Sequence, residues 1–152
     1  MTRLPVLIPA LLLALAACAP GAPKGIDKDT LDEAVGSAIG DGGTCVLIRE
    51  KATGKAVWRY GSHLTCDRTL PSCVGQATQT VADVADAVVK GRPQTISCNS
   101  VADGSRGVGW SSGDAGDPAK GLVYAAVVES DRALPGREIK LRVEAAFKKA
   151  GL

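Results

Sequence analysis

Hydrophobic residues along this chain recur with two different periods, and the change from one period to the other predicts the order of helices and strands. Apolar positions three and four residues apart indicate amphipathic helices, whereas short runs rich in Val, Ile and aromatic residues indicate strands. Helices are predicted over Leu31–Ile39, Val74–Val89 and Ile139–Ala150. Strands are predicted at Thr44–Ile48, Ala56–Tyr60, Gln94–Cys98, Val108–Ser112 and Leu122–Ser130.

The resulting order of elements, α-β-β-α-β-β-β-α, predicts an α+β fold. The connections between the last three strands are short, so these strands are expected to form an antiparallel meander. The segment Leu122–Ser130 is almost entirely apolar, which is typical of a central strand that is covered on both faces. We therefore expect a five-stranded, mostly antiparallel sheet with the helices packed on it.

The first two strands are expected to form a β-hairpin whose register follows from the loop at 51–55. With Gly54 in the left-handed conformation, a three-residue loop pairs the first and last residues of this segment and places Ile48 opposite Trp58. The residues then expected on the opposite face are Cys45, Leu47, Arg49, Val57 and Arg59. A two-residue loop would put an arginine beside Ile48, so we adopt the longer loop and predict that Trp58 faces the helices.

The first eighteen residues have the pattern of a bacterial export signal. Arg3 precedes an apolar run of 14 residues, Leu4–Ala17, which is shorter than the roughly 20 residues that a membrane-spanning helix needs. The tetrad Leu15-Ala16-Ala17-Cys18 resembles the lipobox of bacterial lipoproteins. This resemblance implies cleavage before Cys18, a diacylglycerol thioether on its sulfur, and acylation, for example by palmitate, of the new amine. Ordinary secretory cleavage, which would leave Cys18 unmodified, is the alternative.

The lipoprotein resemblance also implies a place in the cell envelope. Two or three acyl chains anchor a protein stably, because each buried methylene contributes about 0.8 kcal/mol. In diderm bacteria an Asp after the lipidated cysteine resembles an inner-membrane retention signal; Ala19 stands there instead, which favours the outer membrane facing the periplasm. The following residues are rich in Pro and Gly, which predicts a flexible tether. The expected segments are a signal peptide at 1–17, an anchor and tether at 18–28, and a single domain at 29–152.

Four further cysteines, Cys45, Cys66, Cys73 and Cys98, predict two disulfides, since an even set in an exported chain reads as a disulfide framework. Their spacing lacks the close pairs of zinc sites, so no metal is expected. The helix predicted after Cys73 leads away from it and the next strand returns, which predicts Cys73–Cys98. The hairpin register brings Cys45 opposite Gly61, which predicts Cys45–Cys66. A local Cys66–Cys73 bridge is the competing pairing.

Charge and composition narrow the classes of partner. The chain has 18 Lys and Arg against 16 Asp and Glu, without a basic stripe of the kind that nucleic acid attracts. Aromatic residues make up 3% of the chain, which is too few for the stacking platforms that bind single-stranded nucleic acid. We therefore expect no nucleic acid, no cofactor, and an envelope protein as an unidentified partner. Trp110 is the best aromatic candidate for a partner contact, but we favour core packing for it.

The predicted order of elements is similar to that of two protein families. One is the roadblock and profilin group of small α+β scaffolds, which bind partners; this resemblance covers the mature domain as topology alone. The other is the group of penicillin-binding proteins and serine β-lactamases. The segment Thr53-Gly54-Lys55-Ala56-Val57 resembles the hairpin of that group, and Leu70-Pro71-Ser72-Cys73-Val74-Gly75 occupies the place of its Ser-x-x-Lys motif.

The chemistry of the second family does not carry over to this chain. Gly75 stands where the motif after Ser72 requires Lys, so no lysine is one helical turn away to activate the hydroxyl. His63 and Asp67 are near Ser72 in the sequence, so a triad in this region is a conceivable site. We expect no catalytic residues and a membrane-anchored envelope lipoprotein that acts as a binding or assembly module. The alternative is a small serine hydrolase of the acyl-enzyme type, or its inactive remnant.

Overall fold

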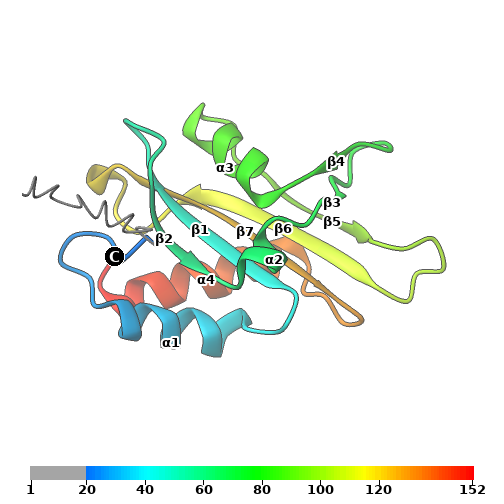
Figure 1. Ribbon diagram of the computed structural model, residues 1–152, viewed down its shortest axis with the longest axis horizontal. Coiled ribbons are helices and arrows are strands. Elements are labelled where there is room, and N and C mark those ends of the chain that lie inside the picture. The colour runs from blue at the N-terminus through cyan, green and yellow to red at the C-terminus, as the bar shows by residue number, and fades with distance from the viewer. Residues whose placement is uncertain (1–19) are drawn as a thin grey trace, which may run out of the picture.

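The computed structural model describes residues 20–152, so the predictions for the signal peptide and for Cys18 lie outside the described residues. The described part is an α+β fold built on a five-stranded antiparallel sheet in the order β2-β1-β7-β6-β5, as predicted (Figure 1). Its elements are α1 (Lys28–Ile39), β1 (Thr44–Glu50), β2 (Ala56–Tyr60), α2 (His63–Cys66), β3 (Leu70–Pro71), β4 (Thr78–Gln79), α3 (Val81–Val89), β5 (Thr95–Asn99), β6 (Gly107–Asp114), the 3-10 helix η1 (Pro118–Lys120), β7 (Leu122–Ser130) and α4 (Gly136–Ala150).

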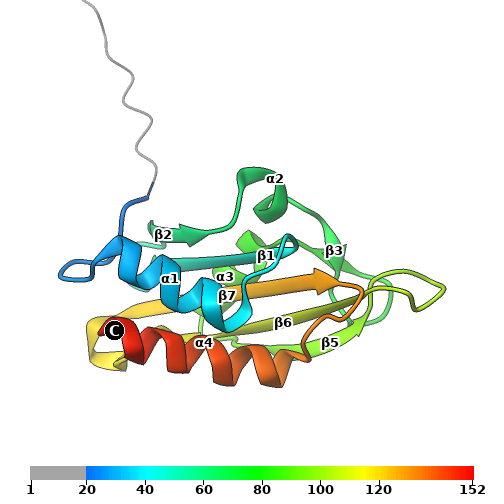
Figure 2. The ribbon, with the colours of Figure 1, turned by 90° about the horizontal axis from the view of Figure 1, so that it is seen from below.

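Helices cover both faces of this sheet. Helices α1 and α4 lie side by side on one face, and α3 packs on the other, where the short β3–β4 ladder also lies (Figure 2). Strand β7 is in the middle of the sheet and is buried at every position between its two terminal residues, as its apolar sequence predicts. The interior is therefore divided into two hydrophobic clusters, one on each side of β7 and β1.

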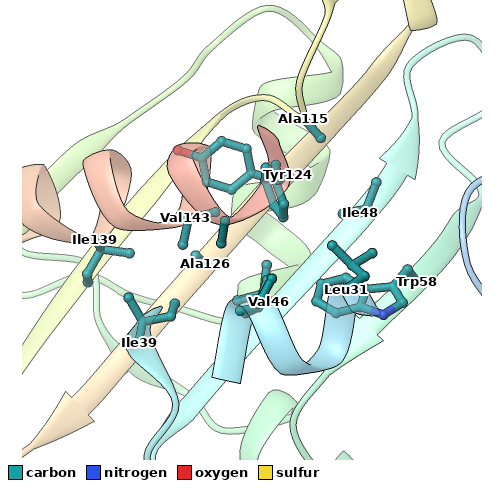
Figure 3. Close-up of a cluster of buried hydrophobic side chains, with 14 of the residues drawn as sticks. Leu31, Ile39, Val46, Ile48, Trp58, Ala115, Tyr124, Ala126, Ile139 and Val143 are labelled. Atoms are coloured by element: carbon teal, nitrogen blue, oxygen red, sulfur yellow. The ribbon is translucent and has the colours of Figure 1, made fainter. Parts of the chain in front are cut away.

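The two tryptophans lie in different clusters. Trp58 is 0% exposed and packs with Leu31 and Ile48 between the sheet and α1 (Figure 3). Trp110 is also 0% exposed, and its indole N–H donates to the carbonyl oxygen of Pro71 at 2.8 Å. The core packing favoured for Trp110 from the sequence is thus confirmed, and the alternative of an exposed partner contact is wrong.

The hairpin register is confirmed at its centre and differs near the turn. Ile48 pairs with Trp58, but Arg49 pairs with Ala56, so Val57 is an extra residue in β2. A bulge of this kind brings two successive side chains to one face, and Val57 packs on the same cluster as Trp58 rather than on the opposite face. The predicted three-residue loop is also wrong, because the amide of Glu50 donates to the carbonyl of Lys55 at 2.9 Å and closes a longer loop.

The helix predicted from Val74 begins instead at Val81. Cys73 and Gly75 both have a left-handed backbone, with φ of 66° and 58°, which is incompatible with a continuing helix. The start at Val81 is set by a capping box, in which Thr80 and Asp83 satisfy each other's backbone amides. The residues before it form the β3–β4 ladder instead.

The first helix begins at Lys28, three residues before the predicted start at Leu31, and part of the predicted tether belongs to the domain. Asp27 is the N-cap of α1, and its side chain accepts from the Thr30 amide. Before it, Pro23 is buried, and the amide of Ile26 donates to the carbonyl of Pro23 at 3.0 Å. Ala22 and Ile26 pack against the hydrophobic cluster beneath α1 and α4. The chain is thus attached to the domain from Ala22 onward.

Two disulfides connect the sheet to the segments that cross its α3 face. Cys45–Cys66 joins β1 to α2, with Cα atoms 5.2 Å apart. Cys73–Cys98 joins the β3–β4 turn to β5, with Cα atoms 5.4 Å apart. These are the pairs predicted from the sequence, although the helix used to argue the second pair is shorter than expected. The five strands of the sheet, both hydrophobic clusters and both disulfides lie within residues 20–152, so this part of the chain has a hydrophobic core and cross-links of its own.

No helix among residues 20–152 has the length and the apolar composition needed to cross a membrane.

Candidate functional site

The residues considered from the sequence as a serine site do not come together. Ser72 is 8% exposed, and its hydroxyl accepts from the Val74 amide at 3.2 Å and lies 3.4 Å from the Val74 carbonyl oxygen. His63 uses its Nδ1 atom to accept a hydrogen bond from Arg59 at 2.8 Å, and Asp67 caps the end of α2. Within the described residues, no side chain hydrogen-bonds to Ser72, so its hydroxyl has no base to activate it.

A charged cluster at the end of β7 centres on Glu129, which is 2% exposed. Arg106 binds its carboxylate through two hydrogen bonds of 2.7 Å, and Arg68 adds a third at 2.8 Å. The hydroxyl of Ser100 donates a fourth at 2.9 Å. These partners come from the α2–β3 loop and the β5–β6 loop, so one carboxylate holds two loops to the central strand.

The hydrogen bonds from Arg106 are the main reason that the pKa of Glu129 is lowered to about 2, against an ordinary value of 4.5. The bonds from Arg68 and Ser100 lower the pKa further, whereas burial opposes them. An ionised carboxylate with every partner in place is a structural anchor, because it has neither a free proton nor an open position for a ligand. We therefore assign the Glu129 cluster to stability.

A polar hollow of about 630 Å³ lies between the end of β6 and α4. Near it, the hydroxyl groups of Tyr124 and Ser111 are 2.8 Å apart, and Lys140 pairs with Glu144 at 2.6 Å. Burial raises the pKa of Tyr124, so this phenol stays protonated at neutral pH. Ser111 is 0% exposed and cannot meet a substrate, so this group holds α4 to the sheet rather than forming a reactive site.

A cavity of about 740 Å³ lies at the end of the sheet where β1 and β2 meet the start of β7. We call it the end-of-sheet pocket. Its lining comes from four parts of the chain that gather at the left end of Figure 1: the entering N-terminal segment, the β1–β2 loop with β2, the start of β7, and the C-terminus. The lining residues are Pro23, Lys24, Ile26, Glu50, Lys51, Ala52, Val57, Lys120, Gly121, Leu122 and Leu152.

Backbone hydrogen bonds and close packing hold the walls of the pocket in place. The amide of Lys51 donates to the carbonyl of Gly121 at 2.8 Å, which ties the β1–β2 loop to the start of β7. Gly121 ends η1 in the left-handed conformation, with φ of 63°. Gly116 lies so close to Leu152 that a Cβ atom would approach its carbonyl carbon to 2.3 Å. The pocket is therefore preformed by the fold rather than by loose loops.

The pocket has an apolar floor and a positive rim. Ile26, Val57 and Leu122 are partly buried and form the floor, where they continue the hydrophobic cluster beneath α1 and α4. The bulge in β2 is what turns Val57 toward this side. An apolar surface that stays partly open at the edge of a core is a surface that a ligand can complete.

Three lysines, Lys24, Lys51 and Lys120, stand on the rim and are exposed. None of them is in an ion pair within the described part of the chain. Lys120 donates to the backbone carbonyl of Gly151 at 2.9 Å, and the one acidic side chain of the rim, Glu50, accepts from Thr53 at 2.7 Å. Among side chains the rim is thus positive, and it would attract an acidic group.

The sequence analysis missed this pocket because its parts are far apart in the chain. The three rim lysines lie at positions 24, 51 and 120, too far apart in the sequence for a local motif to contain two of them. The one local signal is that Lys24 and Lys120 each precede a glycine of positive φ, Gly25 and Gly121, which presents the lysine at a turn.

Comparison of the chain with protein-family models, with curated proteins and with solved structures gives no match, so the function has to be argued from the residues and the pocket themselves.

Proposed function

We propose that this protein is a cell-envelope lipoprotein, anchored through an acylated Cys18, whose single domain is a non-catalytic binding module. The observation that carries the proposal is the end-of-sheet pocket, an apolar hollow beside the point where the chain enters the domain, with three lysines that are in no ion pair among residues 20–152. The contacts of Ser72 offer no activated nucleophile in the described residues, so binding accounts for the molecule better than hydrolysis does.

The length of chain between the anchor and the domain supports this reading. Pro23 is buried in the pocket wall and stands five residues after Cys18. Five extended residues span at most about 18 Å. An acylated Cys18 would therefore keep the pocket close to the bilayer, within reach of molecules that leave or enter it. The two disulfides agree with an oxidising compartment such as the periplasm.

The anchor is tested by mass spectrometry of the protein recovered from envelopes. We expect the mature chain to begin at Cys18 and to carry acyl chains, and we expect Cys18→Ser to leave the precursor uncut. Ser72→Ala is the matched control, since it removes a hydroxyl without touching the lipobox. Recovery of an unmodified mature chain that begins at another residue would contradict the proposal.

The assignment to the outer membrane is tested by replacing Ala19, the residue that follows Cys18. We expect the wild-type protein in the outer-membrane fraction and Ala19→Asp in the inner-membrane fraction after separation on a density gradient. The control is Ala19→Ser, which keeps a small side chain without charge. Recovery of the wild type in the inner-membrane fraction would contradict the assignment to the outer membrane and leave the acylation of Cys18 to the first test.

A further inference from the structure

We propose that the end-of-sheet pocket binds a free single-chain anionic amphiphile of the fatty-acid type, with its acyl chain on the apolar floor and its acidic head on the lysine rim. This inference rests on the proposed function, because it names the ligand of the same binding module.

The floor fits an acyl chain rather than a polar metabolite. Its three partly buried side chains, Ile26, Val57 and Leu122, carry no polar atoms beyond their backbone. The cavity of about 740 Å³ lies within the range of about 300–1,000 Å³ that is typical of small-molecule sites. Each methylene that such a floor removes from water improves the affinity by about fourfold. A chain of several methylenes would therefore bind without any polar contact below the rim.

The rim determines the charge of the head group. Lys24, Lys51 and Lys120 approach the pocket from three different segments, so an acidic group at its mouth would meet positive charge from several sides. Lysine ammonium groups act as flexible point charges on long stems, and those stems add apolar surface to the walls. The lining also includes two carboxylates, that of Glu50, which accepts a hydrogen bond from Thr53, and the terminal carboxylate of Leu152, so the three lysines leave the rim with a net positive charge. A carboxylate or phosphate head is favoured over a neutral or cationic one.

The concave shape distinguishes a discrete ligand from a bilayer surface. A flat membrane can contact the exposed lysines, but it cannot fill a hollow whose floor lies between the N-terminal segment and β2. A free amphiphile can enter this hollow and cover the floor. The short link to Cys18 would hold the open pocket near the membrane, where molecules of this class are released or inserted.

Residues 20–152 are suitable for the test, because they contain both hydrophobic clusters and both disulfides. The probe is palmitate below its micellar concentration, measured by displacement of a fluorescent fatty acid. The matched ligand is monopalmitin, which has the same chain and a neutral head. We expect palmitate to bind at least tenfold more tightly than monopalmitin.

The variant Lys24→Gln/Lys51→Gln/Lys120→Gln is expected to lose at least tenfold in affinity for palmitate and to keep its weak affinity for monopalmitin. The control, Lys90→Gln/Lys148→Gln/Lys149→Gln, removes the same charge from exposed positions outside the pocket lining and should bind like the wild type. Leu122→Asn should weaken both ligands alike. Thermal unfolding of each variant shows that the fold is retained.

Equal affinities of the wild type for palmitate and monopalmitin would show that the lysine rim does not select the acidic head. Equal affinity of the rim variant and the control variant for palmitate would show that palmitate does not bind in the end-of-sheet pocket. Binding to phosphatidylglycerol vesicles without binding of monomeric palmitate would show a bilayer contact instead of a ligand site. The assay uses a chain without Cys18, so a failure here leaves the lipoprotein assignment intact. Conversely, an unmodified Cys18 in the envelope protein would refute the anchor and leave palmitate binding to be judged by this assay.

Discussion

The two ends of strand β7 handle charge in opposite ways. Its first residue, Leu122, borders the end-of-sheet pocket, where three lysines have no acidic partner among the described residues. Near its last residue, Glu129 accepts hydrogen bonds from two arginines and a serine. Seven residues separate these two positions, which corresponds to about 23 Å along a strand. One end of β7 therefore lies beside lysines that have no acidic partner among the described residues, and the other end carries a carboxylate whose charge is fully hydrogen-bonded.

This difference separates stability from binding. A buried carboxylate with all its partners contributes to folding, because losing any partner leaves a charge without compensation. Exposed lysines around an open apolar floor contribute little to folding, because water already solvates them. The Glu129 end is thus where substitutions should unfold the domain, and the pocket end is where they should change what the protein binds.

Replacing Trp58 by Ala should have the largest effect on the free energy of unfolding. This side chain belongs to the part of the core that borders the end-of-sheet pocket. Trp58 is 0% exposed and shares a hydrophobic cluster with the pocket floor, and its indole N–H donates to Asp32 at 2.8 Å. We expect a loss of about 3–5 kcal/mol in the free energy of unfolding, measured by chemical denaturation. Trp58→Phe, which keeps most of the apolar volume, should lose much less. An unchanged midpoint for Trp58→Ala would show that the β1–β2 register is wrong.

Removing the disulfide nearest the Glu129 end should have the next largest effect. Cys45–Cys66 holds α2 to β1, and α2 leads directly to Arg68, so the bridge positions one of the two arginines. Cys45→Ala/Cys66→Ala should lower the free energy of unfolding by about 3 kcal/mol through the loop that it releases. It should also reduce the effect of a later Arg68→Ala change. If a double-mutant cycle shows no coupling between these changes, the disulfide does not position Arg68 for its contact with Glu129.

Replacing Glu129 by a neutral residue tests how much the Glu129 cluster contributes to the free energy of unfolding. Glu129→Gln keeps the shape of the side chain but leaves one acceptor oxygen, so two of the four hydrogen bonds are lost and the other two lose the carboxylate charge. The free energy of unfolding should therefore fall by about 2–3 kcal/mol. The matched control is Glu138→Gln, which breaks an exposed pair with Arg142 on α4 and should change stability by less than about 0.5 kcal/mol. Equal losses in the two variants would mean that the Glu129 cluster is no more than a surface ion pair.

The same carboxylate sets a pH dependence. Because the pKa of Glu129 is lowered in the folded state to about 2 from 4.5, its contribution is complete above about pH 4.5 and is lost as pH falls toward 2. This difference corresponds to about 3 kcal/mol of stability at neutral pH. Glu129→Gln should remove that part of the acid dependence in denaturation curves recorded between pH 6 and pH 2. A wild-type curve that is flat over this range would contradict the lowered pKa.

Replacing the rim lysines should have the smallest effect on folding. The free energy of unfolding of Lys24→Gln/Lys51→Gln/Lys120→Gln should lie within about 0.5 kcal/mol of the wild-type value, since these side chains are exposed and unpaired among the described residues. Chemical denaturation beside Glu129→Gln gives the comparison under one set of conditions. A large loss in the lysine variant would mean that the rim is a structural feature and would end the contrast between the two ends of β7.

Local sequence patterns were enough to predict the order of elements, because each of them depends on near neighbours. The apolar run Leu122–Ser130 predicted the central strand with its observed bounds, and the helical spacing of apolar residues near the C-terminus predicted α4. The pairing of Ile48 with Trp58 followed from keeping arginine off the apolar face. The pairing of the cysteines followed from the order of elements and survived a wrong helix boundary.

The errors fall where backbone conformation or distant packing overrides the local pattern. The helix was predicted to begin at Val74, but the left-handed Cys73 and Gly75 and the capping box at Thr80 delay its start to Val81. The bulge at Val57 could not be predicted, because it serves the packing of the hairpin against the N-terminal segment.

The sequence by itself determined the α+β order, the central strand and the disulfide pairs, since these depend on composition, period and spacing. The expectation of a lipidated Cys18 rests instead on a resemblance to the lipobox, which is also read from the sequence alone. Only the tertiary structure decided which charges meet. Glu129 finds Arg68 and Arg106 across separations of 61 and 23 residues, whereas Lys24, Lys51 and Lys120 gather around an apolar hollow without an acidic partner among the described residues. The physical reason is that the hydrophobic pattern fixes which face of each element is buried, while the ends of the sheet are built by loops whose positions depend on every element they join.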